Sequence, residues 1–210
     1  MKYLTLILLL VLTSHPQPET RLLEGVYRLR NDHEMVAEFH FTAAGRFEFA
    51  FSYGAVDRGA EGSYTIDNHH IILHSDKTPG KDFDITHSER KGTGFTIQIS
   101  DPNPWFRRDV ICIFKKGDKY DQRVSNEDGI AHSTMTECDS IFVGHNLFPD
   151  VMTVIKDPHD TTNNHFELTP NVSLVYLSFK DVSPRIDKDT ITVEMPALFG
   201  IKEAIFEKIK

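Results

Sequence analysis

The chain has 210 residues, of which 40% are hydrophobic and 26% charged, and its 31 acidic side chains outnumber 23 Lys and Arg for a formal charge of −8. This apolar fraction supports a packed core and argues against disorder, and the spread of charges argues against a polytopic membrane protein. The acidity, without a stripe of Lys and Arg between aromatics, predicts no nucleic-acid partner.

The first fifteen residues predict a secretory signal peptide. Lys2 precedes an apolar run from Leu4 to Leu12 that only Thr5 interrupts, and cleavage is expected near Ser14. The run is shorter than the ~20 residues that a membrane-spanning helix needs. We therefore expect a periplasmic or extracellular protein without stable membrane insertion after signal cleavage.

Two cysteines, Cys112 and Cys138, would be exported to a compartment in which disulfides persist. A bridge between them is one alternative. The other is a pair of free thiols, because Cys112 lies in an apolar strand-like run where a free Cys acts as a small core residue. Their spacing predicts neither a zinc site nor a redox pair.

Alternating apolar residues predict two paired strands, 35–41 and 46–53, joined by a turn at 42–45. A third and fourth strand follow at 62–66 and 71–73. The inward face of these strands is aromatic, and we expect it to form a hydrophobic core. The alternative is a cavity for a small apolar ligand, lined by Phe39, Phe47, Phe49, Phe51 and Tyr53.

Two segments in this half of the chain begin in the same way, one of them the strand at 62–66 and the other an earlier segment that starts at Gly25. Gly25-Val26-Tyr27 and Gly62-Ser63-Tyr64 each place a glycine two residues before an inward aromatic. With the turn at 67–68, this pattern over residues 22–87 resembles the strand openings of small lipocalin-like barrels in secreted bacterial proteins. The resemblance implies an antiparallel β unit, and an enclosed ligand if the family's cavity is kept.

A charged and glycine-rich stretch at 88–94 has the composition of an exposed connection. We therefore expect one unit over residues 22–90 and a second over 95–210. The second is predicted to hold short strands at 95–100, 110–114, 119–124, 130–134, 141–143, 151–155, 166–168, 172–179, 190–195 and 201–210. The predicted fold class is all-β, with an N-terminal antiparallel barrel-like or meander unit followed by a β-sandwich.

Within the second unit, the apolar run around Cys112, the turn at 116–118 and the segment 125–131 form a pattern of their own. Over residues 95–170 it resembles the carboxypeptidase-regulatory-like, transthyretin-like β-sandwich. Gly129 would supply the positive φ that the family's turn requires. The resemblance implies a non-catalytic accessory module of exported proteins.

No motif for catalysis, phosphate binding or cofactor binding occurs, so we expect neither an enzyme nor a cofactor. Eleven histidines suggest a metal, but on a regular strand His70 and His74 would lie roughly 13 Å apart, too far to share one ion. No metal site is therefore predicted.

One loop has the composition of a contact surface. It holds Trp105, Phe106, Arg107 and Arg108 after a proline, and aromatics beside arginine are typical interface anchors. The alternative is that Trp105 covers one end of the sandwich core. The sequence thus predicts a non-catalytic binding or structural module whose partner is a protein, glycan or envelope component. A lipocalin-like carrier of a small apolar ligand is the alternative.

Overall fold

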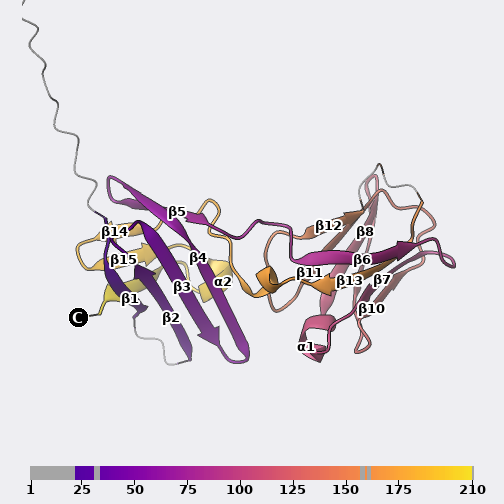
Figure 1. Ribbon diagram of the computed structural model, residues 1–210, viewed down its shortest axis with the longest axis horizontal. Helices are drawn as coiled ribbons and strands as arrows, with labels where there is room; N and C mark the ends of the chain where they lie inside the picture. Colours follow the sequence, from indigo (N-terminus) through magenta and orange to yellow (C-terminus); the bar gives the residue numbers. More distant parts are fainter. Residues whose placement is uncertain (1–21, 31–33, 157–158, 160–161, 210) are drawn as a thin grey trace, which may run out of the picture.

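The computed structural model describes residues 22–30, 34–156, 159 and 162–209, and shows an elongated all-β molecule with a barrel at one end and a sandwich at the other (Figure 1). The predicted fold class is confirmed. The predicted signal peptide, residues 1–15, lies outside the described residues.

The barrel has eight strands in the order β1-β16-β15-β14-β5-β4-β3-β2. Five of them come from the N-terminal part of the chain and three from the C-terminal part. Their bounds are Gly25–Leu29 for β1, Met35–Phe41 for β2, Arg46–Tyr53 for β3, Val56–Asp67 for β4, His70–Ser75 for β5, Arg185–Asp187 for β14, Thr190–Val193 for β15 and Ala204–Lys208 for β16.

The local sequence explains the barrel's first hairpins. The register pairs Phe39 with Phe49, so the alternating aromatics of β2 and β3 share the inner face. Gly62, at the second of the repeated strand openings, has a structural role in β4. A Cβ atom there would lie 2.0 Å from the carbonyl oxygen of His74, so no larger residue fits. Two residues later, the Tyr64 hydroxyl donates a 2.6 Å hydrogen bond to the carbonyl of Leu23.

The sandwich consists of two four-stranded sheets, β10-β7-β13-β6 and β12-β11-β8-β9. Its strands pair antiparallel except β7 and β13, which are parallel. Their bounds are Phe83–Glu89 for β6, Phe95–Ile99 for β7, Val110–Lys116 for β8, Lys119–Val124 for β9, Ile130–Ser133 for β10, Ser140–His145 for β11, Thr153–Lys156 for β12 and His165–Pro170 for β13. Buried aliphatic and aromatic side chains from both sheets form a core separate from that of the barrel.

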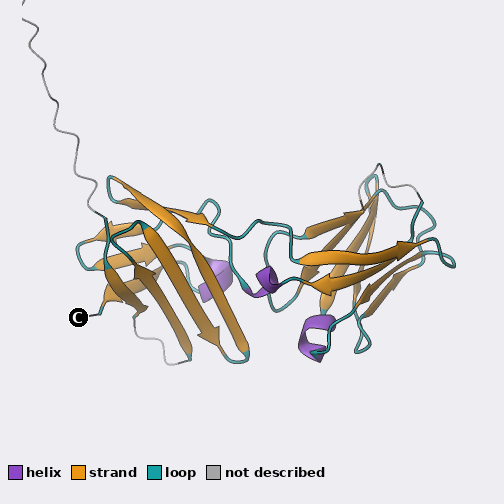
Figure 2. Ribbon diagram, viewed as in Figure 1, coloured by secondary structure: helices purple, strands orange, loops and turns teal. Residues whose placement is uncertain are grey.

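Among the residues that the structure describes, helical structure is limited to three short turns, which are purple in Figure 2. They are α1 (Pro104–Arg107), the 3₁₀ helix η1 (Val172–Val175) and α2 (Pro196–Phe199). Within the described part of the chain, no helix has the length and apolar character needed to cross a membrane.

The chain is divided differently from the predicted units 22–90 and 95–210. β6 belongs to the sandwich, and β14 to β16 return to close the barrel, so the sandwich is inserted between β5 and β14 (Figure 1). Alternation predicts a strand but not which distant strand it pairs with. The predicted terminal strand at 201–210 is present as β16, next to β1.

The predicted strand over residues 172–179 is wrong. Asn171 caps η1 there, because its side-chain oxygen accepts a 3.2 Å hydrogen bond from the Ser173 amide. The chain then runs without regular structure to Pro184, making one isolated bridge between Tyr176 and Gly59 of β4.

Candidate functional site

The barrel interior is filled by its own side chains. Phe39, Phe47, Phe49 and Phe51 are at most 6% exposed, as predicted for inward residues. Phe179, from the segment that returns from the sandwich, places its ring among the first three, with centroids 5.5, 5.9 and 5.2 Å away. These distances are those of packed aromatic pairs. The space that a carrier would offer to a ligand is therefore occupied by phenylalanine rings.

Tyr53 does not join this interior. It is the last residue of β3 and 48% exposed, because the β3–β4 hairpin extends past the end of the barrel core. The expectation that it lines an apolar cavity with the four phenylalanines is wrong.

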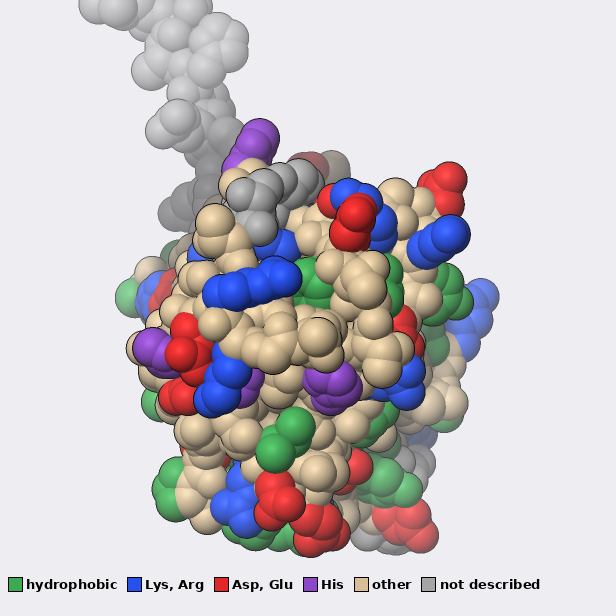
Figure 3. Space-filling model, turned by 90° about the vertical axis from the view of Figure 1, so that its right-hand side faces the viewer, with side chains coloured by type: hydrophobic (Ala, Val, Ile, Leu, Met, Phe, Trp, Pro, Cys, Tyr) green, Lys and Arg blue, Asp and Glu red, His purple; other side chains and the backbone are tan. Residues whose placement is uncertain are grey.

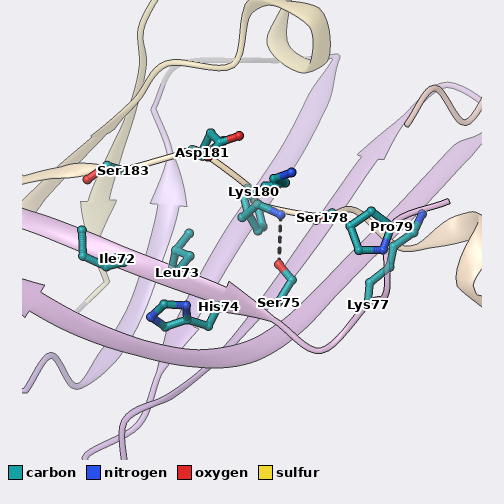
Figure 4. A pocket seen from close by; sticks show the side chains of 12 residues that line it. Ile72, Leu73, His74, Ser75, Lys77, Pro79, Ser178, Lys180, Asp181 and Ser183 are labelled. Carbon is teal, nitrogen blue, oxygen red and sulfur yellow. Dashed lines mark hydrogen bonds between the residues drawn. The ribbon is translucent and has the colours of Figure 1, made fainter. Parts of the chain in front are cut away.

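A groove of about 660 Å³ runs along the outside of the barrel, between β5 and residues 178–183 (Figure 4). It forms because β14 pairs with β5 at one position, Arg185 with His70. At its other end, the Phe179 amide donates a 2.9 Å hydrogen bond to the Ser75 hydroxyl. Its ionisable lining residues are His74, Lys77, Lys180 and Asp181. Lys77 is already paired with Asp82 and Asp150, so the groove favours neither sign of charge in a ligand.

The predicted contact loop forms α1 and the residues around it. The Asn103 side chain caps the helix by accepting a 3.1 Å hydrogen bond from the Trp105 amide, and proline follows as the first helical residue. Trp105 is 50% exposed, and the Arg108 guanidinium lies 4.0 Å from the centre of its ring. The cation fixes the position of an aromatic ring that faces solvent.

The other two members of the loop have different roles. Phe106 packs against the sandwich core. Arg107 is structural, because its Nε donates to the carbonyl of Glu127 at 3.0 Å and one Nη donates to that of Asp101 at 3.2 Å. Phe106 therefore contributes to the end of the core, the role that one alternative gave to Trp105.

His145, the last residue of β11, contacts the backbone of α1 from the sandwich side. It is 2% exposed, its Nε2 lies 2.9 Å from the Trp105 carbonyl, and its Nδ1 accepts a 3.1 Å hydrogen bond from the Leu147 amide. These partners require a neutral ring with its proton on Nε2. Burial lowers the pKa of His145, which favours the same neutral form.

In the ribbon, α1 and the tip of the β3–β4 hairpin lie on facing ends of the sandwich and the barrel (Figure 1). A hollow of about 370 Å³ is lined by residues of both, and we call it the junction hollow. Both units of the fold contribute to its walls, which are mostly apolar. It is lined by Ala55, Asp57, Asn103, Trp105, Phe106, Leu147, Phe148 and Val175. Asp57 is the one ionisable side chain in this lining.

A second hollow of about 300 Å³ lies on another side of Phe106. Its lining includes Asp101, Asn171, Val172 and Tyr176. Val172 is 83% exposed and Tyr176 is 36% exposed. Apolar surface therefore continues from the junction hollow onto η1.

Buried charges hold the two units together beside these hollows. Lys77 Nζ lies 3.0 Å from the carboxylate of Asp82 and 2.7 Å from that of Asp150, and it donates to the Tyr176 carbonyl at 2.8 Å. The side chain of Lys77 is 2% exposed and that of Asp82 is 5% exposed. Groups so far from water need these partners, so the network fixes the barrel against the sandwich.

Arg58 extends this network from β4. Its guanidinium donates to the carbonyls of Pro149 at 3.1 Å and Tyr176 at 3.2 Å. Burial lowers the pKa of Arg58, and the carboxylates of Asp150 and Asp82 oppose that shift. Arg58 shares the alternation that places Ala60 and Tyr64 on the inner face of β4. That alternation indicates a buried charge, although Arg58 is not among the predicted site residues.

The two cysteines are both buried and free, so the free-thiol alternative describes the structure. Cys112 lies within the sandwich core, and burial raises its pKa to about 12. Burial also raises the pKa of Cys138, whose Sγ lies 3.1 Å from the Ser140 carbonyl.

Among the described residues, no group of three or more His, Cys, Asp or Glu side chains is placed to hold a metal ion. On the end of the sandwich that faces the viewer in Figure 3, basic and acidic side chains are interspersed. That face therefore has no surface of a single charge sign that would select a charged partner.

Comparison of the chain with protein-family models, with curated proteins and with solved structures finds no match. The structure shows only the coarser part of the two expected resemblances, an all-β chain with an eight-stranded closed barrel and two further sheets.

Proposed function

We propose that the protein is a non-catalytic binding module that acts through surface contacts, and that the junction hollow with the exposed ring of Trp105 is its contact site. The observation that carries this proposal is the position of Trp105. A half-exposed tryptophan, held by Arg108 at 4.0 Å, lines a largely apolar hollow between the barrel and the sandwich. Exposed aromatic anchors next to a pocket are characteristic of binding surfaces.

Two further observations favour surface binding over the alternatives. The phenylalanine rings inside the barrel leave the carrier alternative without a visible ligand space. Asp57 is the one ionisable side chain that lines the hollow, so the hollow offers no pair of titratable side chains to act as acid and base.

The proposed location is the periplasm or the extracellular space, supported by the apolar run after Lys2. A partner must then be present in the same compartment, as an exported protein, a glycan or another envelope component.

Native mass spectrometry of the protein purified from its host envelope tests the proposal. We expect a retained protein or glycan with the wild type and its loss with Trp105→Ala. Tyr120→Ala is a matched control, because this aromatic residue is 70% exposed on β9 in a different part of the sandwich. A retained small apolar molecule that survives Trp105→Ala would support the carrier instead.

A further inference from the structure

We infer that the junction hollow binds a neutral carbohydrate. This inference rests on the proposed function, because it names the ligand of the same site. It follows from four features of the hollow: its aromatic wall, its charges, its polar groups and its size.

The aromatic wall suits the apolar face of a sugar ring. Trp105 and Phe106 from α1 and Phe148 from the segment after β11 all line the hollow. Flat rings make their largest contact with a ligand that is itself flat and carries C–H groups on one face. A pyranose has such a face and carries hydroxyl groups around its edge.

The charges disfavour ionic ligands of either sign. Asp57 is exposed at the wall and forms no ion pair with another described residue, so it repels an anion. Trp105 lines the hollow but Arg108 does not, so we place the guanidinium on the side of the ring turned away from the hollow. A cation already bound to the ring weakens its attraction for a second one. Asp57 alone would attract a cation, but the Arg108 guanidinium beside the Trp105 ring repels it. The two charges oppose each other, so the hollow suits a neutral ligand.

The polar groups of the wall match hydroxyl donors. The Asp57 carboxylate accepts hydrogen bonds and donates none, so it suits the edge of a sugar. Asn103 already uses its side-chain oxygen to cap α1, which leaves its NH₂ group as a donor to a ligand oxygen. An apolar lining with a few placed polar groups is the usual composition of small-molecule sites.

The size of the hollow favours a short glycan over a folded protein. Its 370 Å³ lies within the range of about 300–1,000 Å³ that is typical of small-ligand sites. A stable protein interface covers about 800 Å² and about 20–30 residues on each partner, whereas eight residues line this hollow.

The test is calorimetric titration of the full chain with neutral hexasaccharides of glucose, xylose and N-acetylglucosamine, alongside anionic oligogalacturonate and cationic chitosan oligomers. We expect at least one neutral oligosaccharide to bind with a Kd of about 10 µM to 1 mM. Because Trp105 is the chain's single tryptophan, its emission should shift with the same saturation curve.

Variants then assign the binding to the hollow. Trp105→Ala on α1 and Asp57→Ala on the barrel hairpin should each weaken it about tenfold or more, whereas Tyr120→Ala should leave it within about twofold. Asp57 is exposed, so its variant keeps the fold even if Trp105→Ala does not.

The inference is overturned if no neutral oligosaccharide binds more tightly than about 10 mM, if a charged oligomer binds better, or if binding survives both variants. Native mass spectrometry separates failure of this inference from failure of the proposed function. If only the carbohydrate inference is wrong, the wild type still retains an envelope protein and Trp105→Ala does not. If the proposed function is wrong, the wild type retains neither a protein nor a glycan.

Discussion

Replacement of Phe179 by alanine tests the statement that the barrel is filled by its own side chains. The ring of Phe179 is 1% exposed and packs against Phe39, Phe47 and Phe49 at centroid distances of 5.2 to 5.9 Å. Truncation of a buried phenylalanine costs about 3–5 kcal/mol of unfolding free energy, because apolar burial is lost and a cavity remains. We expect a loss in this range for Phe179→Ala.

Urea unfolding followed by far-ultraviolet circular dichroism measures this loss, and the fluorescence of Trp105 reports separately on the sandwich. Val172→Ala is the control, since Val172 is 83% exposed and its truncation should change stability by no more than about 0.5 kcal/mol. The cavity left by Phe179→Ala would be lined by apolar rings, and such cavities bind benzene. The variant should therefore bind benzene and the wild type should not.

Two results would refute this reasoning. A destabilisation below about 1 kcal/mol would mean that the Phe179 ring does not fill the interior. Saturable binding of benzene by the wild type would mean that the barrel already has an open cavity, and the carrier alternative would regain support.

Three further predictions concern buried groups. Lys77→Met should cost about 3–5 kcal/mol, because it leaves two buried carboxylates without their cation, and a urea midpoint equal to that of the wild type would contradict this. Cys112 should resist labelling by iodoacetamide at about pH 8 until the protein unfolds, because its pKa of about 12 leaves roughly one thiol in ten thousand ionised. Cys138 should label more slowly than a solvent-exposed thiol, because burial raises its pKa too. Mass spectrometry that finds a Cys112–Cys138 bridge would overturn both expectations. His145, whose pKa lies below its unfolded value of about 6.5, should contribute stability that is present above that pH and lost as the pH falls below it. The difference in melting temperature between wild type and His145→Gln, measured from about pH 8 to pH 5, should shrink on acidification, and a constant difference would contradict the assignment.

Strands with strong alternation could be predicted from the sequence. The aromatics of β2 and β3 repeat at every second position, and their pairing needs a turn of four residues, so both the strands and the hairpin follow from local sequence. The closure of the barrel does not follow from local sequence. β16 pairs with β1 across nearly the whole chain, and no local pattern distinguishes it from a sandwich strand.

The candidate site was predictable in part. A proline, two aromatics and two arginines predicted an interaction loop at α1, and the structure exposes Trp105 there, while the contact itself stays a prediction. Asp57 was not predicted, because it lines the hollow only after the barrel and the sandwich are joined. The role of Lys77 was hidden for the same reason, since its partner Asp150 lies more than 70 residues further along the chain.

The most direct test of the proposed function is a ¹H–¹⁵N NMR titration of the protein with the component retained from its envelope. The single tryptophan provides one indole N–H resonance, which marks the junction hollow. We predict that this resonance and the amide of Asp57 shift with one common saturation curve while the amides of Phe39 and Phe49 do not move. Shifts confined to the barrel interior, with the indole resonance unchanged, would contradict a binding module that acts through its junction surface.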